Sequence, residues 1–134
     1  MTVVLDANVV VAAFAAHGIC EAVLELCLDA HHILISEQLL DEIAQSLKHK
    51  LKLPASTATR ILTFLRESTT LVTPAPVPPD ACRDPEDLHV LGLAVAGSAD
   101  CLVTGDNDLL VLEKVAECRI LSPRAFWEAV RTRN

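Results

Sequence analysis

The chain has 134 residues, of which 51% are hydrophobic, and its formal net charge is -7 at pH 7. This length suits one domain over residues 1–134, and the content of only seven prolines and four glycines argues against disorder. The acidic charge disfavours tight, purely electrostatic binding to nucleic acid. It does not exclude a nuclease that needs metal ions, because such an enzyme collects carboxylates where it holds its cations.

The cysteines indicate a reducing compartment. There are five, an odd number without a C-x-x-C pair, and they stand mostly among apolar residues, as core thiols of a cytoplasmic protein do. The apolar run over 7–20 follows Asp6 and no basic segment, so it is not interpreted as a signal peptide. No stretch reaches the roughly 18 apolar residues of a membrane span. We therefore expect a cytoplasmic location without membrane association.

Strands alternate with helices along the chain. Short apolar segments predict strands at 2–5, 32–35, 69–73 and 101–104, and a small one near 118–121. Helical spacing and capping residues predict helices at 9–14, 18–31, 36–50, 57–67 and 84–97, a short one from Asn107 and a last one opened by Ser122. This alternation predicts an α/β fold, a three-layer sandwich around a mostly parallel sheet.

The helix predicted at 36–50 carries two acidic neighbours with different expected positions. Leu39, Ile43 and Leu47 form its apolar stripe. At 100° per residue, Glu42 lies at the margin of that stripe and Asp41 points almost opposite. Glu42 is therefore expected to reach inward, whereas Asp41 is expected to be solvated.

Acidic residues bracket an apolar helix and the short apolar strand that follows it. Asp84 and Asp87 precede a helix that is apolar nearly all round, and Asp106 and Asp108 follow the strand after it. In a parallel sheet, ligands bind outside the carboxyl ends of the strands. Asp6 and Asp106 stand at two such ends, Asp87 opens the helix that leads to the second, and Glu42 lies within two turns of another. These four carboxylates are predicted to converge.

A converging group of carboxylates has a clear chemical use. Two like charges 4 Å apart repel by about 4 kcal/mol at an effective dielectric of 20, so the group must either take up protons or bind a cation. Carboxylate oxygens without histidine or cysteine favour Mg²⁺ or Mn²⁺ over zinc. Such an ion activates a water, holds a phosphodiester and neutralises the leaving oxygen.

Each acidic residue also has a structural interpretation. Asp84 and Asp87 are suited to capping a helix, and between Asp106 and Asp108 the second is the more expected cap of the helix that follows. Asp6 has no cap to make unless it serves the helix at Asn8, which favours function. Thr104 either ends its strand or orients Asp106 and a substrate phosphate.

The histidines and lysines give weaker signals. His17, His31, His32, His49 and His89 show no ligand spacing, so they are interpreted as structural or surface residues. A cluster of cations near the end of the helix at 36–50 complements the helix dipole or contacts an RNA backbone. The candidates for RNA contact are Lys48, Lys50, Lys52 and Arg60.

Four motifs follow one another along the chain. They are a strand with Asp6-x-Asn8, Ser36 and Glu42 with five residues between them on one helix, Asp84-Pro-Glu-Asp87 opening a buried helix, and Leu102-Val-Thr-Gly-Asp106. The ordered set resembles the PIN domain family over essentially the whole chain. The segments Cys82-Arg-Asp-Pro-Glu-Asp87 and Val103-Thr-Gly-Asp-Asn-Asp-Leu-Leu110 resemble those of the VapC-like toxins of toxin–antitoxin systems.

The resemblance implies a Mg²⁺- or Mn²⁺-dependent ribonuclease of PIN-like fold. It makes Asp6, Glu42, Asp87 and Asp106 the catalytic, metal-binding quartet. Supporting residues are then Asn8 and Thr104, with Asp84 and Asp108 as additional acids. It also implies an RNA substrate, a homodimer and, for the toxins, a cognate antitoxin protein that holds the enzyme inactive.

Three other functions compete. A haloacid-dehalogenase-like phosphatase has a second aspartate where this chain has Asn8, and a lysine near the later acidic pair that residues 98–112 lack. A response-regulator receiver has paired acids after the first strand and a late lysine, which are missing too. A non-catalytic module whose acidic edge holds a cation or a basic partner stays open.

Overall fold

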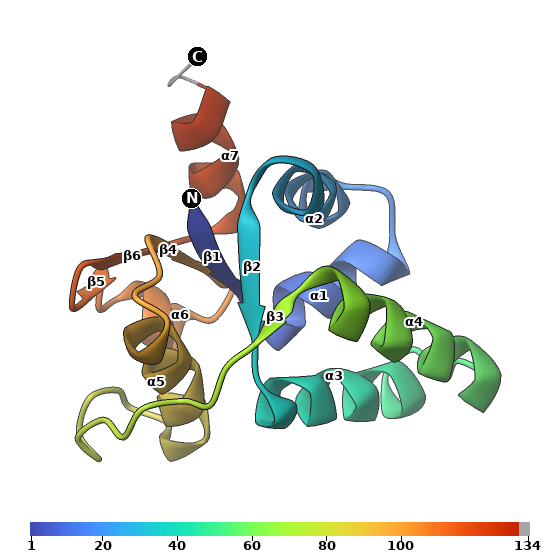
Figure 1. The fold of residues 1–134 in the computed structure, drawn as a ribbon, viewed down its shortest axis with the longest axis horizontal. Coiled ribbons are helices and arrows are strands. Elements are labelled where there is room, and N and C mark those ends of the chain that lie inside the picture. The colour runs from blue at the N-terminus through green and yellow to red at the C-terminus, as the bar shows by residue number, and fades with distance from the viewer. Residues whose placement is uncertain (132–134) are drawn as a thin grey trace.

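The protein is built around a sheet of short apolar strands (Figure 1). Within residues 1–131, which the computed structural model describes, six strands pair in the order β3-β2-β1-β4-β6-β5. Their bounds are β1 Thr2–Leu5, β2 His32–Ile35, β3 Thr70–Leu71, β4 Cys101–Val103, β5 Lys114–Val115 and β6 Cys118–Leu121. All pairs are parallel except β5 with β6, so the predicted mostly parallel α/β sheet is confirmed.

Helices flank the sheet, with α5 and α6 on one side of the central strands and α1 to α4 on the other (Figure 1). Their bounds are α1 Ala7–Ala15, α2 Ile19–Ala30, α3 Glu37–His49, α4 Ala55–Ser68, η1 Pro85–Asp87, α5 Leu88–Ala96, α6 Asn107–Leu110 and α7 Pro123–Arg131. Here η1 is a single 3₁₀ turn. The helix α5 packs on β1 and β2, and α1 contacts both α2 and α3.

The register of the central strands places two predicted site segments side by side. Leu5 of β1 pairs with Val103 of β4, so both strands end at the same level. The amide of Asp6 then donates to the carbonyl of Val103 at 2.9 Å. Val3 and Val4 beneath, like Leu102, are fully buried, as expected for strands covered on both faces. The buried ends of β1 and β4 thus support the acidic residues at the carboxyl edge of the sheet.

Several element bounds differ from the predictions. The strand predicted at 69–73 shortens to Thr70–Leu71 at the sheet edge, because Pro74 lacks the N–H that would continue the ladder. The short strand β5 was not predicted, since it pairs only with its neighbour in a hairpin. Helix α1 begins at Ala7 rather than Val9 and α4 at Ala55 rather than Thr57. None of these differences moves the acidic edge.

The states of the cysteines and the lengths of the apolar helices were also predicted from the sequence. All five cysteines are free thiols, and four of them are buried. Among the described residues no single helix has both the length and the apolarity to cross a membrane; α1 and α2 meet these criteria only together, and a bend of 108° separates them.

Candidate metal centre

Asp6 follows β1 and caps α1. Its Oδ1 accepts from the amide of Ala7 at 2.8 Å, which is the cap that the sequence left open for the helix near Asn8. The residue is only 4% exposed, and this burial, partly offset by the hydrogen bonds it accepts, raises the pKa of its carboxyl. A buried carboxyl at a strand end with a raised pKa is a candidate functional group.

Asn8 and Thr104 hold Asp6 from two sides. Both donate to Oδ2 of Asp6, Thr104 Oγ1 at 2.7 Å and Asn8 Nδ2 at 3.1 Å. The amide oxygen of Asn8 also accepts from the backbone of Gly105 at 3.0 Å, which ties the loop after β4 to α1. With Ala7, three donors use three of about four acceptor positions on the carboxylate, so one position on Oδ1 remains for a cation.

Asp106 caps α6, and the expectation that Asp108 is the cap is wrong. Oδ1 of Asp106 accepts from the amide of Asp108 at 2.9 Å, and its own amide donates to Thr104 Oγ1 at 3.0 Å. The helix therefore begins at Asn107, one residue after Asp106, and Asp108 lies in its first turn. A cap occupies one carboxylate oxygen, which leaves the other oxygen of Asp106 to face the neighbouring acids.

Asp84 and Asp87 have separate roles at η1. Oδ1 of Asp84 accepts from the amide of Glu86 at 3.0 Å, so Asp84 caps the turn as predicted. The side chain of Asp87 makes no cap, and its Oδ2 is buried without a hydrogen-bond partner among the described residues. Burial, reinforced by the adjacent Asp106, raises the pKa of Asp87 to about 7. This oxygen lacks the partner that a buried carboxylate needs.

Glu42 reaches the group from α3. Its side chain is 39% exposed, and its Oε1 lies 2.6 Å from Nε2 of His89 on α5. Asp41 is exposed, as its place on the helix predicts. His89 was interpreted only as structural or surface, and its contact with Glu42 was missed. The two residues are 47 positions apart, so no local spacing signals the pair.

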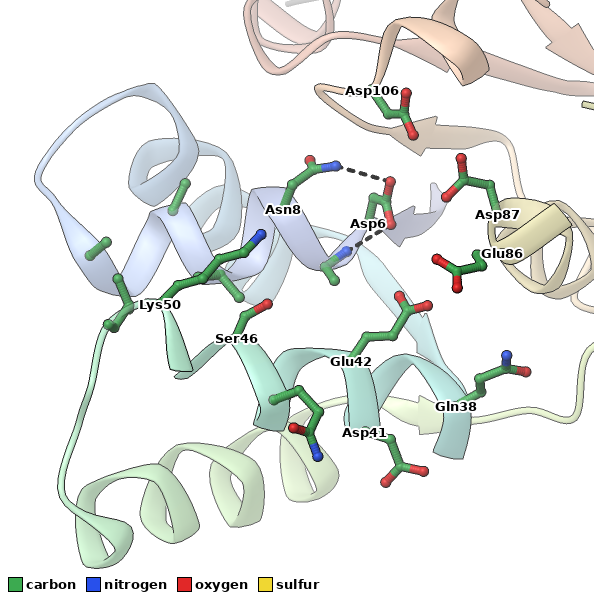
Figure 2. A pocket seen from close by; sticks show the side chains of 16 residues that line it. Asp6, Asn8, Gln38, Asp41, Glu42, Ser46, Lys50, Glu86, Asp87 and Asp106 are labelled. Carbon is green, nitrogen blue, oxygen red and sulfur yellow. Dashed lines mark hydrogen bonds between the residues drawn. The ribbon is translucent and has the colours of Figure 1, made fainter. Parts of the chain in front are cut away.

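One open cavity of about 740 Å³ collects most of these side chains (Figure 2). The predicted residues that line it are Asp6, Asn8, Glu42, Lys50, Asp87 and Asp106. Figure 2 shows the carboxyl groups of Asp6, Glu42 and Asp87 facing a common space, with Glu86 beside them. Convergence of the four carboxylates, from segments a hundred residues apart, is therefore observed.

Other predicted residues lie outside this cavity. Thr104 is fully buried behind Asp6, and Asp84 is taken up by its cap. Asp108 lines a separate hollow with Arg83, whose Nη1 is 3.9 Å from its Oδ1. Arg60 lines an apolar hollow beside Phe64. Lys48 and Lys52 are exposed and line neither hollow nor cavity.

The acidic residues around Asp87 suit a hard divalent cation. Oxygens of Asp87, Asp106 and Asp108 lie within 4.8 Å of one another, the spacing of ligands around one ion. The unpartnered Oδ2 of Asp87 would gain its missing partner from such an ion. The three residues of this trio all offer carboxylate oxygens, which Mg²⁺ and Mn²⁺ prefer. The residues thus fit the predicted metal, although the closest trio includes Asp108 in place of Asp6 and Glu42.

Comparison with known proteins identifies the family. A sequence model of the PIN domain matches residues 2–108, which include every segment of the acidic group. The chain belongs to the PIN domain family. A search of curated proteins found no match.

Two solved structures share the fold of this PIN domain. One is VapBC2 from Rickettsia felis bound to a DNA fragment from their promoter, with a TM-score of 0.63 and 18% identity over 90% of this chain and 97% of the matched chain. The other is the T. brucei RRP44 PIN domain, with a TM-score of 0.53 and 13% identity over 98% of this chain and 82% of that one. At these identities the likeness establishes the fold.

Proposed function

We propose that this PIN domain is a Mg²⁺- or Mn²⁺-dependent endoribonuclease. The observation that carries the proposal is one cavity lined by Asp6, Glu42, Asp87 and Asp106, among which Asp87 has a buried oxygen without a hydrogen-bond partner in the described residues. Family membership supports it, because PIN domains are generally nucleases. The competing phosphatase is disfavoured, since the polar residue two positions after Asp6 is Asn8, whose amide is engaged with Asp6 and Gly105.

The residues of the cavity, together with Thr104 behind Asp6, have different roles in phosphodiester hydrolysis. The quartet would hold the cation, which when bound would supply an activated water and charge neutralisation at the leaving oxygen. Thr104 and Asn8 hold Asp6 in place, so that it need not reorganise during the reaction. Lys50, at the other end of the cavity in Figure 2, is suited to a neighbouring phosphate of the RNA.

The toxin of a toxin–antitoxin pair is the biological role we propose. The fold is similar to that of VapBC2, and the sequence motifs resemble those of VapC-like toxins. On this proposal the protein is cytoplasmic, forms a homodimer and is held inactive by a cognate antitoxin. Purification of the protein from its own cells would reveal a small co-purifying partner if this role is right.

Calorimetric titration with Mn²⁺ tests the metal site first. The parent and Asp106→Asn are compared after both are shown to fold, with Asp29→Asn as the matched control because Asp29 is exposed on α2. We expect binding that Asp106→Asn weakens at least tenfold and Asp29→Asn leaves unchanged. Equal binding in all three proteins would place the ion elsewhere.

RNA cleavage by the parent and by Asp6→Asn then separates an enzyme from a binding module. A nuclease cleaves RNA with Mn²⁺, stops when the ion is chelated, and loses most of its rate in the variant. A module that only holds a cation would bind Mn²⁺ and leave RNA intact. Cleavage by Asp6→Asn at the parental rate would refute the proposed role of the quartet.

A further inference from the structure

His89 and Glu42 form a close pair beside the acidic group. Nε2 of His89 lies 2.6 Å from Oε1 of Glu42, which joins α5 to α3 from opposite sides of the sheet. The His89 side chain is only 7% exposed, whereas that of Glu42 is 39% exposed. His89 does not line the cavity that Glu42 lines. The imidazole therefore contacts Glu42 from outside the cavity.

The direction of this hydrogen bond follows from the groups involved. A carboxylate oxygen accepts, so Nε2 of His89 carries the proton and donates it to Glu42. The other ring nitrogen, Nδ1, is buried and has no hydrogen-bond partner among the described residues. Glu42 is thus the hydrogen-bond partner that sets the orientation of the ring, and the ring in turn occupies one oxygen of Glu42.

Glu42 needs such support more than Asp6 and Asp106 do. Asp6 and Asp106 each cap a helix, so a backbone amide fixes one oxygen of each carboxylate. Glu42 stands in the middle of α3 on a longer side chain and makes no cap. Losing its rotamer freedom costs free energy, and a hydrogen bond from a buried donor offsets that cost. With Oε1 held by His89, Oε2 is left for the cavity.

We propose that His89 is a positioning residue that holds Glu42 ready to bind the metal ion. The inference rests on the proposed metal-dependent function. Partners of this kind behind a ligand orient it, and their removal costs about 10- to 100-fold in metal affinity. His89 acts through Glu42 and touches neither ion nor substrate, which separates its role from that of the quartet.

Mn²⁺ affinity measured by calorimetry tests this role. His89→Leu removes the donor while filling the buried space, and we expect Mn²⁺ to bind about tenfold more weakly. His89→Gln keeps an N–H near the position of Nε2 and should restore most of the affinity. His17→Leu is the matched control, because His17 forms a similar pair with Glu21 at 3.0 Å on the exposed surface. It should bind Mn²⁺ as the parent does.

A double-mutant cycle separates positioning from a general structural effect. In a Glu42→Gln background, His89→Leu should add little further loss of Mn²⁺ affinity, because the ligand it holds is already gone. An equal loss in both backgrounds, or parental affinity in His89→Leu, would overturn the positioning role while leaving the proposed nuclease standing. A parent that binds no Mn²⁺ with or without RNA would remove the proposed function and this inference together.

Discussion

Oγ1 of Thr104 lies 2.7 Å from Oδ2 of Asp6, although the two residues are 98 positions apart in the chain. The same hydroxyl accepts from the amide of Asp106 at 3.0 Å. Both Thr104 and Asp6 are almost completely buried, so water cannot replace these bonds. A single hydroxyl therefore joins the ends of β1 and β4 and sets the relative position of two proposed metal ligands.

Replacing this hydroxyl by a methyl group should be costly. Thr104→Val keeps the shape of the side chain but leaves a buried carboxyl without one of its donors. We expect the free energy of unfolding to fall by about 1.5–3 kcal/mol, as for other hydrogen bonds to charged groups. Urea unfolding measures the change. Thr104→Ser keeps the hydroxyl and should recover more than half of the loss; equal losses in both variants would show that the hydrogen bond is not the cause.

The metal-free protein should lose stability as the pH rises. Asp87 ionises near 3.8 in an unfolded chain and near 7 in the folded protein, because its burial and Asp106 disfavour the charge. Between these values the folded state binds more protons than the unfolded state, so stability is full below pH 4 and falls until pH 7. Allowing for solvent screening at a partly exposed site, we expect a loss of about 1–2 kcal/mol from this group.

Asp87→Asn isolates this effect, since an amide cannot ionise. In the presence of a chelator, the variant should match the parent near pH 4 and be more stable than the parent at pH 8. Added Mn²⁺ should stabilise the parent at pH 8 but not the variant. Urea midpoints at both pH values give the comparison, and a variant with the same pH dependence as the parent would contradict the assignment to Asp87.

Most of the fold was predictable because its elements are locally encoded. The strands at 2–5 and 32–35 have the predicted bounds, since each is an apolar run that ends at a polar residue. The strands β3 and β5 were misjudged or missed because pairing partners, and not their own two residues, define them. The starts of α1 and α4 shifted by two residues, because Asp6 and Pro54 rather than later residues begin the turn. The helix predicted over 84–97 begins as a 3₁₀ turn and becomes α-helical only at Leu88.

The position of a site residue could be predicted where the sheet topology determines it, but not where a loop path or helix packing does. The convergence of Asp6 and Asp106 followed from parallel strands that end at one edge. The choice of Asp106 over Asp108 as the cap did not, because both can begin a helix and only the loop path selects one. The contact of His89 with Glu42 depends on how α5 and α3 approach across the sheet edge, which no sequence spacing records.

Lys50 should contribute more to RNA binding than its neighbours. It is the one of the four predicted cations that lines the acidic cavity, where Figure 2 shows its amino group directed toward Asn8. We expect Lys50→Ala to weaken RNA binding and to lower the salt dependence of binding by about one released counterion. Lys48→Ala and Lys52→Ala are the matched controls, and fluorescence anisotropy at several salt concentrations measures all three.

Mn²⁺ affinity provides the second readout for Lys50. Because the lysine offers no ligand to a cation, its loss should leave Mn²⁺ binding nearly intact while RNA affinity falls. If Lys48→Ala lowered the salt dependence and Lys50→Ala did not, the RNA path would run over the exposed end of α3 instead of through the cavity.

Gly92 allows the chain before η1 to lie against α5. A Cβ at this position would stand 2.2 Å from the carbonyl oxygen of Ala75, whose amide also donates to the carbonyl of Gly92 at 3.0 Å. Gly92→Ala must therefore push the proline-rich connector away, and we expect a loss of about 1–3 kcal/mol in unfolding free energy. At Gly18, the N-cap of α2, a Cβ meets nothing within 4 Å, so Gly18→Ala should cost only the roughly 0.5–1 kcal/mol expected for alanine in place of glycine at a helix N-cap. The same displacement would move Asp87, which the connector leads to, so Mn²⁺ affinity should fall in Gly92→Ala and stay unchanged in Gly18→Ala. Parental stability of Gly92→Ala would mean that the connector is not held against α5 in solution.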